Sequence, residues 1–296
     1  MIANGVPVAG QWRGCEGQAG MTDATAWQGA VGDVWAKEWR RTDRSFSDLS
    51  RHLDRAIAAV APERGRACDI GCGAGSTSLA LAGARPELDI VGVDLSAALV
   101  DIARSRAMES PRLRFLAGDV EQVAPALGRC DLFLSRHGVM FFPAPLVAFR
   151  RLRDAAVDGA PFVFSCFRTP AENGWATGLV EAVTGKAPVA ATGYAPGPFG
   201  FAEPVFVADM LRDSGWHGGD PVAVDYVYRA GAGDDPVEDA LAFFCRIGPA
   251  AAALSRLAAN EREPARDRMR CVLRRHVSAG GVDFAAAAWI WTARAA

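Results

Sequence analysis

The sequence predicts a protein of the α/β class, with an open, mostly parallel, doubly wound sheet that carries helices on both faces. Two observations predict this fold. From Arg66 onward, short apolar runs alternate with helical segments, and strands joined by helical crossovers form parallel sheets of this kind. A glycine-rich turn also follows the first apolar run directly, as it does where a strand ends at a nucleotide-type ligand.

The apolar periodicity places the individual elements. Strands are expected at 66–70, 89–93, 112–116, 130–135 and 160–166, and helices at 75–83, 96–107, 143–156 and 204–213. Two later strands, 221–228 and 284–293, would complete a sheet of seven. The alanine run of the second is equally compatible with a helix, so that strand depends on the family resemblance described below.

The remaining segments are expected to surround this sheet. Residues 1–23 resemble a disordered leader, and Met21 is an alternative start. The predicted organisation is a leader (1–23), a helical cap (24–62), a ligand-binding core (63–167), a lid insertion (168–203), a continuation of the core (204–230), a helical insertion with helices near 236–246 and 249–278 (231–281) and a last core strand (282–296). Long insertions on a compact fold often form lids or substrate walls, although solvated decoration is the alternative.

Composition excludes several classes of function. The 296 residues carry a net charge of −2 without a dense basic block, which argues against a nucleic-acid surface. No apolar run approaches the length of a membrane span. The seven cysteines form no C-x-x-C pair, and the four histidines have no metal-ligand spacing. We therefore expect no metal site and a cytoplasmic setting with reduced thiols.

The glycine turn has a recognisable spacing. Gly71, Gly73 and Gly75 form G-x-G-x-G after Asp69, whereas a dinucleotide turn would require Gly or Ala where Ser76 stands. Glycine lets the backbone approach a ligand closely, and the amides of the following helix face its anionic groups. Asp94 ends the next strand, where an acid is placed to accept hydrogen bonds from ribose hydroxyls.

This pattern resembles motif I of the class I S-adenosylmethionine (SAM) methyltransferases, whose sheet is Rossmann-like and seven-stranded. The resemblance implies that Asp69 faces the ammonium group of SAM, and that Asp119 binds the adenine amino group. As an alternative, Asp119 caps the following helix. The implied cofactor-binding set is Asp69, Gly71, Cys72, Gly73, Gly75, Asp94, Leu95, Ser96, Asp119, Val120 and Ser135.

Ser-Arg-His-Gly-Val-Met-Phe-Phe at 135–142, Asn-Gly-Trp at 173–175 and Pro-Gly-Pro-Phe-Gly-Phe at 196–201 resemble a group of bacterial small-molecule methyltransferases. In that group the residue at position 137 is usually Phe. Here it is His137, which is a candidate catalytic base with a pKa near neutrality. The alternative is a histidine that is hydrogen-bonded to the backbone and packs in place of an aromatic ring.

Other side chains are candidates for the acceptor pocket. Arg136, Arg168 and Arg246 are candidates for binding an anionic acceptor, with structural ion pairs as the alternative. Six aromatic residues outside the sheet are candidates for roofing an enclosed site, although each could instead be core: Trp27, Trp35, Trp175, Tyr194, Phe199 and Phe201. The substrate-binding set selected from these is Arg136, Arg168, Trp175, Phe199 and Phe201.

The expected activity is transfer of a methyl group from SAM to an O or N nucleophile of a small metabolite, with carbon as a further option and S-adenosylhomocysteine as the product. The expected partner is this small-molecule acceptor, without nucleic acid or membrane, and the protein is expected to be a monomer or homodimer. The alternatives are a SAM-binding module without catalysis and an NAD(P)-dependent oxidoreductase.

Overall fold

A single mixed sheet organises the part of the chain that the structure describes. The computed structural model describes residues 24–107, 110–188 and 193–296, so the predicted leader lies outside it. The strands are β1 (Gly65–Ile70), β2 (Leu88–Asp94), β3 (Leu113–Ala117), β4 (Leu132–Arg136), β5 (Pro161–Phe167), β6 (Trp216–His217), β7 (Val222–Gly231), β8 (Val277–Ser278) and β9 (Gly281–Ala295).

The sheet has the order β3-β2-β1-β4-β5-β9-β6, with β7 and β8 also paired to β9. Strands β1 to β5 are parallel, and β9 runs antiparallel to its neighbours. The predicted doubly wound α/β fold is confirmed, and the alanine run at the end of the chain is a strand.

The predicted number of seven strands is wrong, because the described residues form nine. Strands β6 and β7 share one side of β9, where they pair with its last and its earlier residues respectively. They are separated at Gly218 and Gly219, whose φ angles of 77° and 102° are unfavourable for continuous strand. Strand β8 is a two-residue addition that is joined to β9 by a turn at Ala279 and Gly280.

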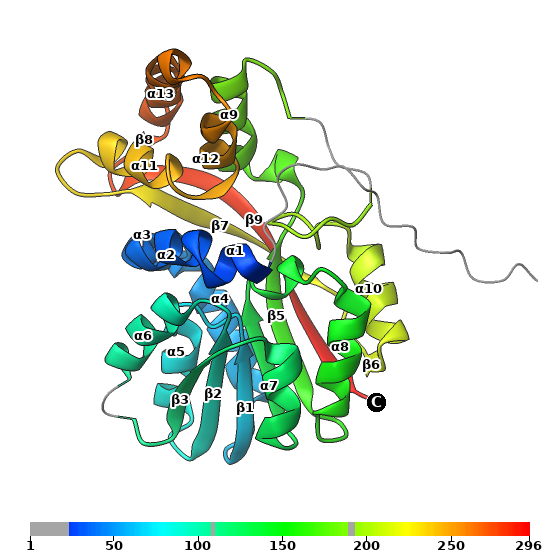
Figure 1. Cartoon of the computed structure of the whole chain (residues 1–296). Coiled ribbons are helices and arrows are strands. Elements are labelled where there is room, and N and C mark those ends of the chain that lie inside the picture. Colours follow the sequence, from blue (N-terminus) through cyan, green and yellow to red (C-terminus); the bar gives the residue numbers. More distant parts are fainter. Residues whose placement is uncertain (1–23, 108–109, 189–192) are drawn as a thin grey trace, which may run out of the picture.

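Helices cover both faces of the sheet (Figure 1). Helices α5 (Ser76–Ala84) and α6 (Ala97–Arg106) pack against β2 and β3, and α4 (Ser47–Val60) packs against α5, β5, β7 and β9. Helix α7 (Val120–Leu127) packs against β2 and α8 (Pro145–Asp154), and α10 (Pro204–Asp213) packs against α8 and β6. For α5, α6 and α8 the observed bounds lie within two residues of the predicted ones, and for α10 both bounds are as predicted.

The other helices lie at the end of the sheet where β1, β2 and β4 finish. Figure 1 shows the three short N-terminal helices between this edge and an arm formed by β7 and the first half of β9. They are α1 (Ala24–Gln28), α2 (Ala30–Lys37) and α3 (Trp39–Ser45). The arm is covered by α9 (Gly174–Thr184), α11 (Pro236–Phe244), α12 (Gly248–Ser255) and α13 (Ala259–Arg274), and two short 3-10 turns span Val139–Phe141 and Pro170–Glu172.

The predicted helix at 249–278 is wrong as a single element. It is divided into α12 and α13 at Ala258, whose ψ angle of 154° is extended. The backbone amide of Ala258 donates to the Glu261 carboxylate at 3.0 Å, which caps the start of α13. No helix within the described ranges is both long and apolar enough to cross a membrane.

The core of the sheet is largely aromatic on the face of α8. Every residue of β5 is buried, because the strand has neighbours on both edges and helices on both faces. Phe149 of α8 contacts the rings of Phe162 and Phe164, with centroid distances of 5.2 and 5.7 Å. The Trp216 indole N–H donates to the Phe149 carbonyl at 2.9 Å, which ties the sheet edge to this helix.

We expect Phe149→Ala to lower the free energy of unfolding by about 3–5 kcal/mol, because the fully buried ring would leave a cavity among rigid neighbours. Val205→Ala is the control, since Val205 lies in α10 with 72% of its surface exposed and should change stability by less than about 0.5 kcal/mol. Urea unfolding followed by circular dichroism measures both, and equal midpoints would contradict the prediction.

Candidate functional site

A cavity of about 320 Å³ lies at the carboxyl ends of the central strands. Three parts of the chain line it: the strand tips and following turns, the N-terminal helices and the helical arm. Its described lining includes Asp69, Gly71, Cys72, Gly73, Asp94, Leu95, Asp119 and Val120 from the first part, Trp27, Trp35, Trp39, Thr42, Asp43 and Phe46 from the second, and Trp175, Tyr228, Phe243 and Ile247 from the third. The fold thus brings residues from both ends of the sequence together.

Two glycines explain the shape of the turn after β1. Gly73 has a φ angle of 54°, and a Cβ added there would meet no atom within 4 Å, so its backbone borders open space. Gly71 has a φ angle of 63°, and its Cβ would lie 3.1 Å from the Cα of Gly138. The turn therefore needs glycine both for its left-handed backbone and for the close approach of the loop after β4.

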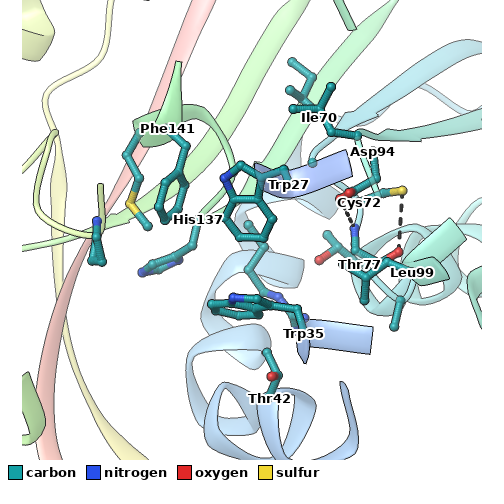
Figure 2. Close-up of a pocket in the computed structure, with 18 of the residues that line it drawn as sticks. Trp27, Trp35, Thr42, Ile70, Cys72, Thr77, Asp94, Leu99, His137 and Phe141 are labelled. Atoms are coloured by element: carbon teal, nitrogen blue, oxygen red, sulfur yellow. Dashed lines mark hydrogen bonds between the residues drawn. The ribbon is translucent and has the colours of Figure 1, made fainter. Parts of the chain in front are cut away.

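Asp94 is held at the end of β2 by two backbone amides. Gly73 N–H donates to its Oδ2 at 2.8 Å, and Ser96 N–H donates to its Oδ1 at 2.9 Å. Figure 2 shows the first of these bonds on the same side of the cavity as Cys72 and Thr77. A carboxylate oxygen can accept more than one hydrogen bond, so each oxygen of Asp94 retains capacity for ligand hydroxyls.

Asp69 is buried at the end of β1 and only half of its carboxylate is satisfied. Its Oδ2 accepts a hydrogen bond of 2.5 Å from the Ser78 hydroxyl, whereas the buried Oδ1 has no partner among the described residues. Burial is the main cause that raises the pKa of Asp69 to about 7, and the charge of Asp94 adds to it. An unpartnered buried carboxylate oxygen that lines a cavity suits a cationic ligand group.

The other predicted cofactor residues divide into two sets. Cys72, Leu95, Asp119 and Val120 line the cavity. Asp119 is also the N-cap of α7, and its Oδ1 accepts a hydrogen bond from the Glu121 amide at 2.9 Å. This is the alternative role, capping of the following helix, that the sequence predicts for Asp119.

Gly75, Ser96 and Ser135 do not contribute to the described lining. Gly75 has a φ angle of 82°, and a Cβ added there would lie 2.7 Å from the Phe115 ring. Ser135 is fully buried and donates to the Ile70 carbonyl at 2.7 Å, so it joins the tips of β4 and β1. Ser96 caps α6 by accepting from the Leu99 amide at 3.3 Å. Both hydroxyls hold strand tips and helix ends in place.

His137 occupies a strained and enclosed position after β4. It is the one non-glycine residue of the described chain with a positive φ angle, 58°, a conformation that costs free energy and is often found at functional sites. Its Nδ1 lies 2.8 Å from the Ser165 hydroxyl, and its ring packs between Phe46 and Phe167. The buried Nε2 has no partner among the described residues.

The expected near-neutral pKa of His137 is wrong. Burial, with a smaller effect from the charge of Arg136, lowers the pKa of His137 to about 3. The imidazole is therefore uncharged throughout the physiological pH range, and it offers a hydrogen-bonding nitrogen in place of a titrating group.

The three candidate arginines are all engaged in ion pairs. Arg136 lines the cavity, but its guanidinium pairs with Asp43 at 2.9 Å and donates to the Ser50 hydroxyl. Arg168 pairs with Glu172 and with Asp225, the latter at 2.9 Å. Arg246 pairs with the buried Glu38 at 2.8 Å. Arg168 and Arg246 do not belong to the described lining.

Three of the six aromatic residues predicted to roof the site line the cavity: Trp27, Trp35 and Trp175. Figure 2 shows Trp27 and Trp35 between the side that carries Cys72 and Asp94 and the side that carries His137 and Phe141. Phe199 does not belong to the described lining and stacks on Trp175 at a centroid distance of 6.2 Å. Tyr194 and Phe201 pack on each other outside the lining, with Phe201 fully buried.

Several lining residues were not predicted as part of the site. Phe46, Phe167 and Tyr228 form a continuous aromatic wall with Trp175, and Phe243 of α11 lines the same cavity. These residues come from separate parts of the chain, and nothing in their local sequence distinguishes them from core residues. Asp43 was also missed. The position of Phe167 at the end of a buried strand was the one available signal, since parallel strands end at ligand sites.

Comparisons with known proteins agree with this geometry. Residues 67–159 match the family model described as "Methyltransferase domain". Trans-aconitate 2-methyltransferase of Deinococcus radiodurans is 33% identical over 100 residues, which are 33% of this chain and 37% of that protein. The chain spans about a third to a half of the length of the first curated relatives that it matches.

Two solved structures share the fold. The YcgJ protein of Bacillus subtilis superposes with a TM-score of 0.52 at 15% identity, over 83% of this chain and 98% of that one. Phosphoethanolamine N-methyltransferase 2 of Haemonchus contortus, solved with phosphomonomethylethanolamine and S-adenosylhomocysteine, gives a TM-score of 0.50 at 16% identity, over 90% and 57% of the two chains. The family match covers the part of the chain that holds β1 to β4 and the glycine turn, so this core is similar to methyltransferase domains, and the two solved structures share its fold.

Proposed function

We propose that this protein transfers a methyl group from SAM to an O or N nucleophile, or alternatively to a carbon, of a small metabolite and releases S-adenosylhomocysteine. The observation that carries the proposal is the pair of buried carboxylates, Asp69 and Asp94, that line one cavity beside a glycine turn. The motifs at 135–142 and 196–201 support a place within the bacterial small-molecule group.

The residues present fit the cofactor. The unpartnered Oδ1 of Asp69 suits the ammonium group, and the oxygens of Asp94 suit the ribose hydroxyls. Open space beside Gly73 allows close approach to the backbone, and Leu95 and Val120 offer apolar contacts for adenine. When bound, SAM supplies a methyl group activated by a positively charged sulfur.

The chain's own contribution is alignment and exclusion of water. Trp27 and Trp35 lie over the cavity from the cap, and Trp175 borders it from the arm. When the methyl donor and the acceptor are held in line, they react as if they were parts of one molecule, which can account for much of a rate enhancement. We propose that 63–167 binds the cofactor, while the cap (24–62) and the two insertions (168–203 and 231–281) enclose the acceptor.

The cell compartment is part of the proposal. The described cysteines are all free thiols, namely Cys68, Cys72, Cys130, Cys166, Cys245 and Cys271. Free thiols in this number support a reducing cytoplasm. An enclosed cavity at the strand tips supports a small-molecule acceptor, in preference to a nucleic acid.

We expect Asp94→Ala to weaken S-adenosylhomocysteine binding by about 2–4 kcal/mol, because ribose hydroxyls would lose charged acceptors in a buried site. Asp89→Ala is the control, since Asp89 lies at the opposite end of β2 and pairs with Arg112 on the surface. Isothermal titration with S-adenosylhomocysteine and with NADH measures both variants. Unchanged affinity in a folded Asp94→Ala protein would refute the assignment, and NADH binding would favour an oxidoreductase.

Cofactor affinity should depend on pH through Asp69. In the free protein its pKa is raised to about 7, and a neighbouring ammonium group lowers the pKa of a carboxyl. Below pH 7 the Asp69 carboxyl of the free protein is protonated, so it must lose its proton when the cofactor binds, and this costs free energy. Above the raised pKa the carboxyl is already ionised and the cost disappears. We expect affinity for S-adenosylhomocysteine to rise between about pH 5 and 7 and then to level off.

Titration calorimetry in two buffers with different ionisation enthalpies counts the released protons. Asp69→Asn should bind more weakly and lose most of this pH dependence, because its side chain does not titrate. An affinity of the wild type that is independent of pH would show that Asp69 does not meet the ammonium group.

His137→Phe should keep cofactor affinity but lower kcat by about 10- to 100-fold, the loss expected for one hydrogen bond in a buried site. This loss is smaller than general-base catalysis often gives, because an imidazole with a pKa of about 3 is a weak base. The wild-type rate should show no inflection near pH 6.5. Full activity of His137→Phe would assign the ring to packing alone, and an inflection near pH 6.5 would restore a titrating base.

A further inference from the structure

The end of the cavity beyond the glycine turn has almost wholly apolar walls. Its described walls are Phe46, Phe167, Trp175, Tyr228, Phe243 and Ile247, which we call the aromatic end. All six side chains are buried. Trp175 lies stacked on Tyr228 at 5.1 Å, and Phe46 contacts both Tyr228 and Phe167. Such walls favour an apolar ligand with a ring that can pack on them.

The charged groups near the aromatic end are neutralised by one another. Arg136 carries the one cationic side chain among the described residues that line the cavity. Its Nη2 pairs with Oδ1 of Asp43, and Oδ2 of Asp43 pairs with Arg106. A ligand carboxylate that paired with Arg136 would compete with Asp43 and leave this partly buried carboxylate with Arg106 alone. The cavity also holds the negative charges of Asp94 and Asp119, which repel anions.

With Asp69 Oδ1 assigned to the cofactor, three polar atoms remain for an acceptor. The Nε2 of His137, the Oγ1 of Thr42 and the indole N–H of Trp27 are buried without a partner among the described residues, and all three residues line the cavity. His137 is the one of the three whose ring lies against Phe46 and Phe167 of the aromatic end. The His137 ring is fixed by Ser165, whose hydroxyl meets Nδ1 at 2.8 Å and whose carbonyl accepts the His137 backbone amide at 3.1 Å. A buried ring nitrogen of this kind requires a hydrogen-bonding partner, and an uncharged hydroxyl supplies one without adding charge.

We propose that the methyl acceptor is an uncharged aromatic compound whose hydroxyl meets His137 Nε2 while its ring packs in the aromatic end. The proposal rests on the proposed methyltransferase function. In the reaction the hydroxyl oxygen forms the new bond to the methyl carbon, and the sulfur–carbon bond breaks with its electron pair staying on sulfur. His137 Nε2 accepts a hydrogen bond from the hydroxyl and orients its oxygen toward the methyl group, and the hydroxyl proton is released to solvent, so charge and atoms balance.

A matched pair of probes tests the proposal: 2-naphthol and 2-naphthoate share a ring system but differ in charge at neutral pH. Each is titrated into the 296-residue protein, alone and with saturating S-adenosylhomocysteine, and binding is followed by calorimetry. We expect 2-naphthol to bind at least about 10-fold more tightly than 2-naphthoate, equivalent to 1.4 kcal/mol. Equal or tighter binding of 2-naphthoate, or no binding of 2-naphthol, would overturn the proposal.

Variants locate the bound probe. His137→Phe and Trp175→Ala should each weaken 2-naphthol binding by about 5- to 10-fold without changing S-adenosylhomocysteine affinity. Phe206→Ala is the control, because Phe206 stacks on Tyr194 outside the described lining. Unchanged 2-naphthol affinity in a folded His137→Phe protein would contradict the assigned contact. Because Trp175 is buried, its loss could unfold the arm, and the probe pair on the wild type decides in that case.

The experiment separates this inference from the function on which it rests. If S-adenosylhomocysteine does not bind, the proposed function fails, while the titrations of the free protein still test the aromatic end. If S-adenosylhomocysteine binds but 2-naphthoate is preferred over 2-naphthol, the methyltransferase assignment stands and the uncharged acceptor is refuted.

Discussion

The enclosure of the cavity depends on Asp43, a carboxylate that pairs with two arginines from different parts of the fold. Its Oδ1 contacts Arg136 at the tip of β4, and its Oδ2 contacts Arg106 at the end of α6, both at 2.9 Å. Arg106 also donates to the Ala74 carbonyl within the glycine turn. One side chain of α3 thereby fixes the cap to β4, to α6 and to the turn at once.

The same short helix reaches the arm through further ion pairs. Arg41 and Arg44 both contact Asp239 of α11 at 2.7 Å, and the buried Glu38 beside α3 pairs with Arg246. Removing one partner of a buried pair costs more than the pair contributes, because the other charge stays without compensation. Helix α3 therefore acts as a joint between the sheet and the arm, and the aromatic end is shaped by this joint.

The sequence was most informative where a local pattern determines the structure. The apolar period of α10 predicted both of its ends, and the spacing of Gly71, Gly73 and Gly75 predicted a tight turn beside two acids. Contacts between distant segments could not be predicted in this way. Arg136 and Asp43 are 93 residues apart, and each reads locally as a surface charge.

The sequence also does not show which aromatic side chains are enclosed by the core and which border the cavity. Phe201 and Trp175 look equally suited to a pocket, yet Phe201 is enclosed by Phe149 and Phe164 while Trp175 borders the cavity. Likewise, the pKa of His137 depends on the burial that Phe46 and Phe167 provide. Alternation predicts which face of a strand is apolar, but the neighbour on that face is set by the tertiary fold.

The position of β9 has a consequence for how the chain is synthesised. Strand β5 is buried along its whole length and pairs on one edge with β9, which lies more than a hundred residues later. At about 5–20 residues per second, a ribosome needs several seconds to produce the missing neighbour. During that interval β5 exposes an apolar edge of the kind that recruits other strands. Expression at lower temperature, or with abundant chaperones, should therefore raise the yield of soluble protein without raising the stability of the folded protein.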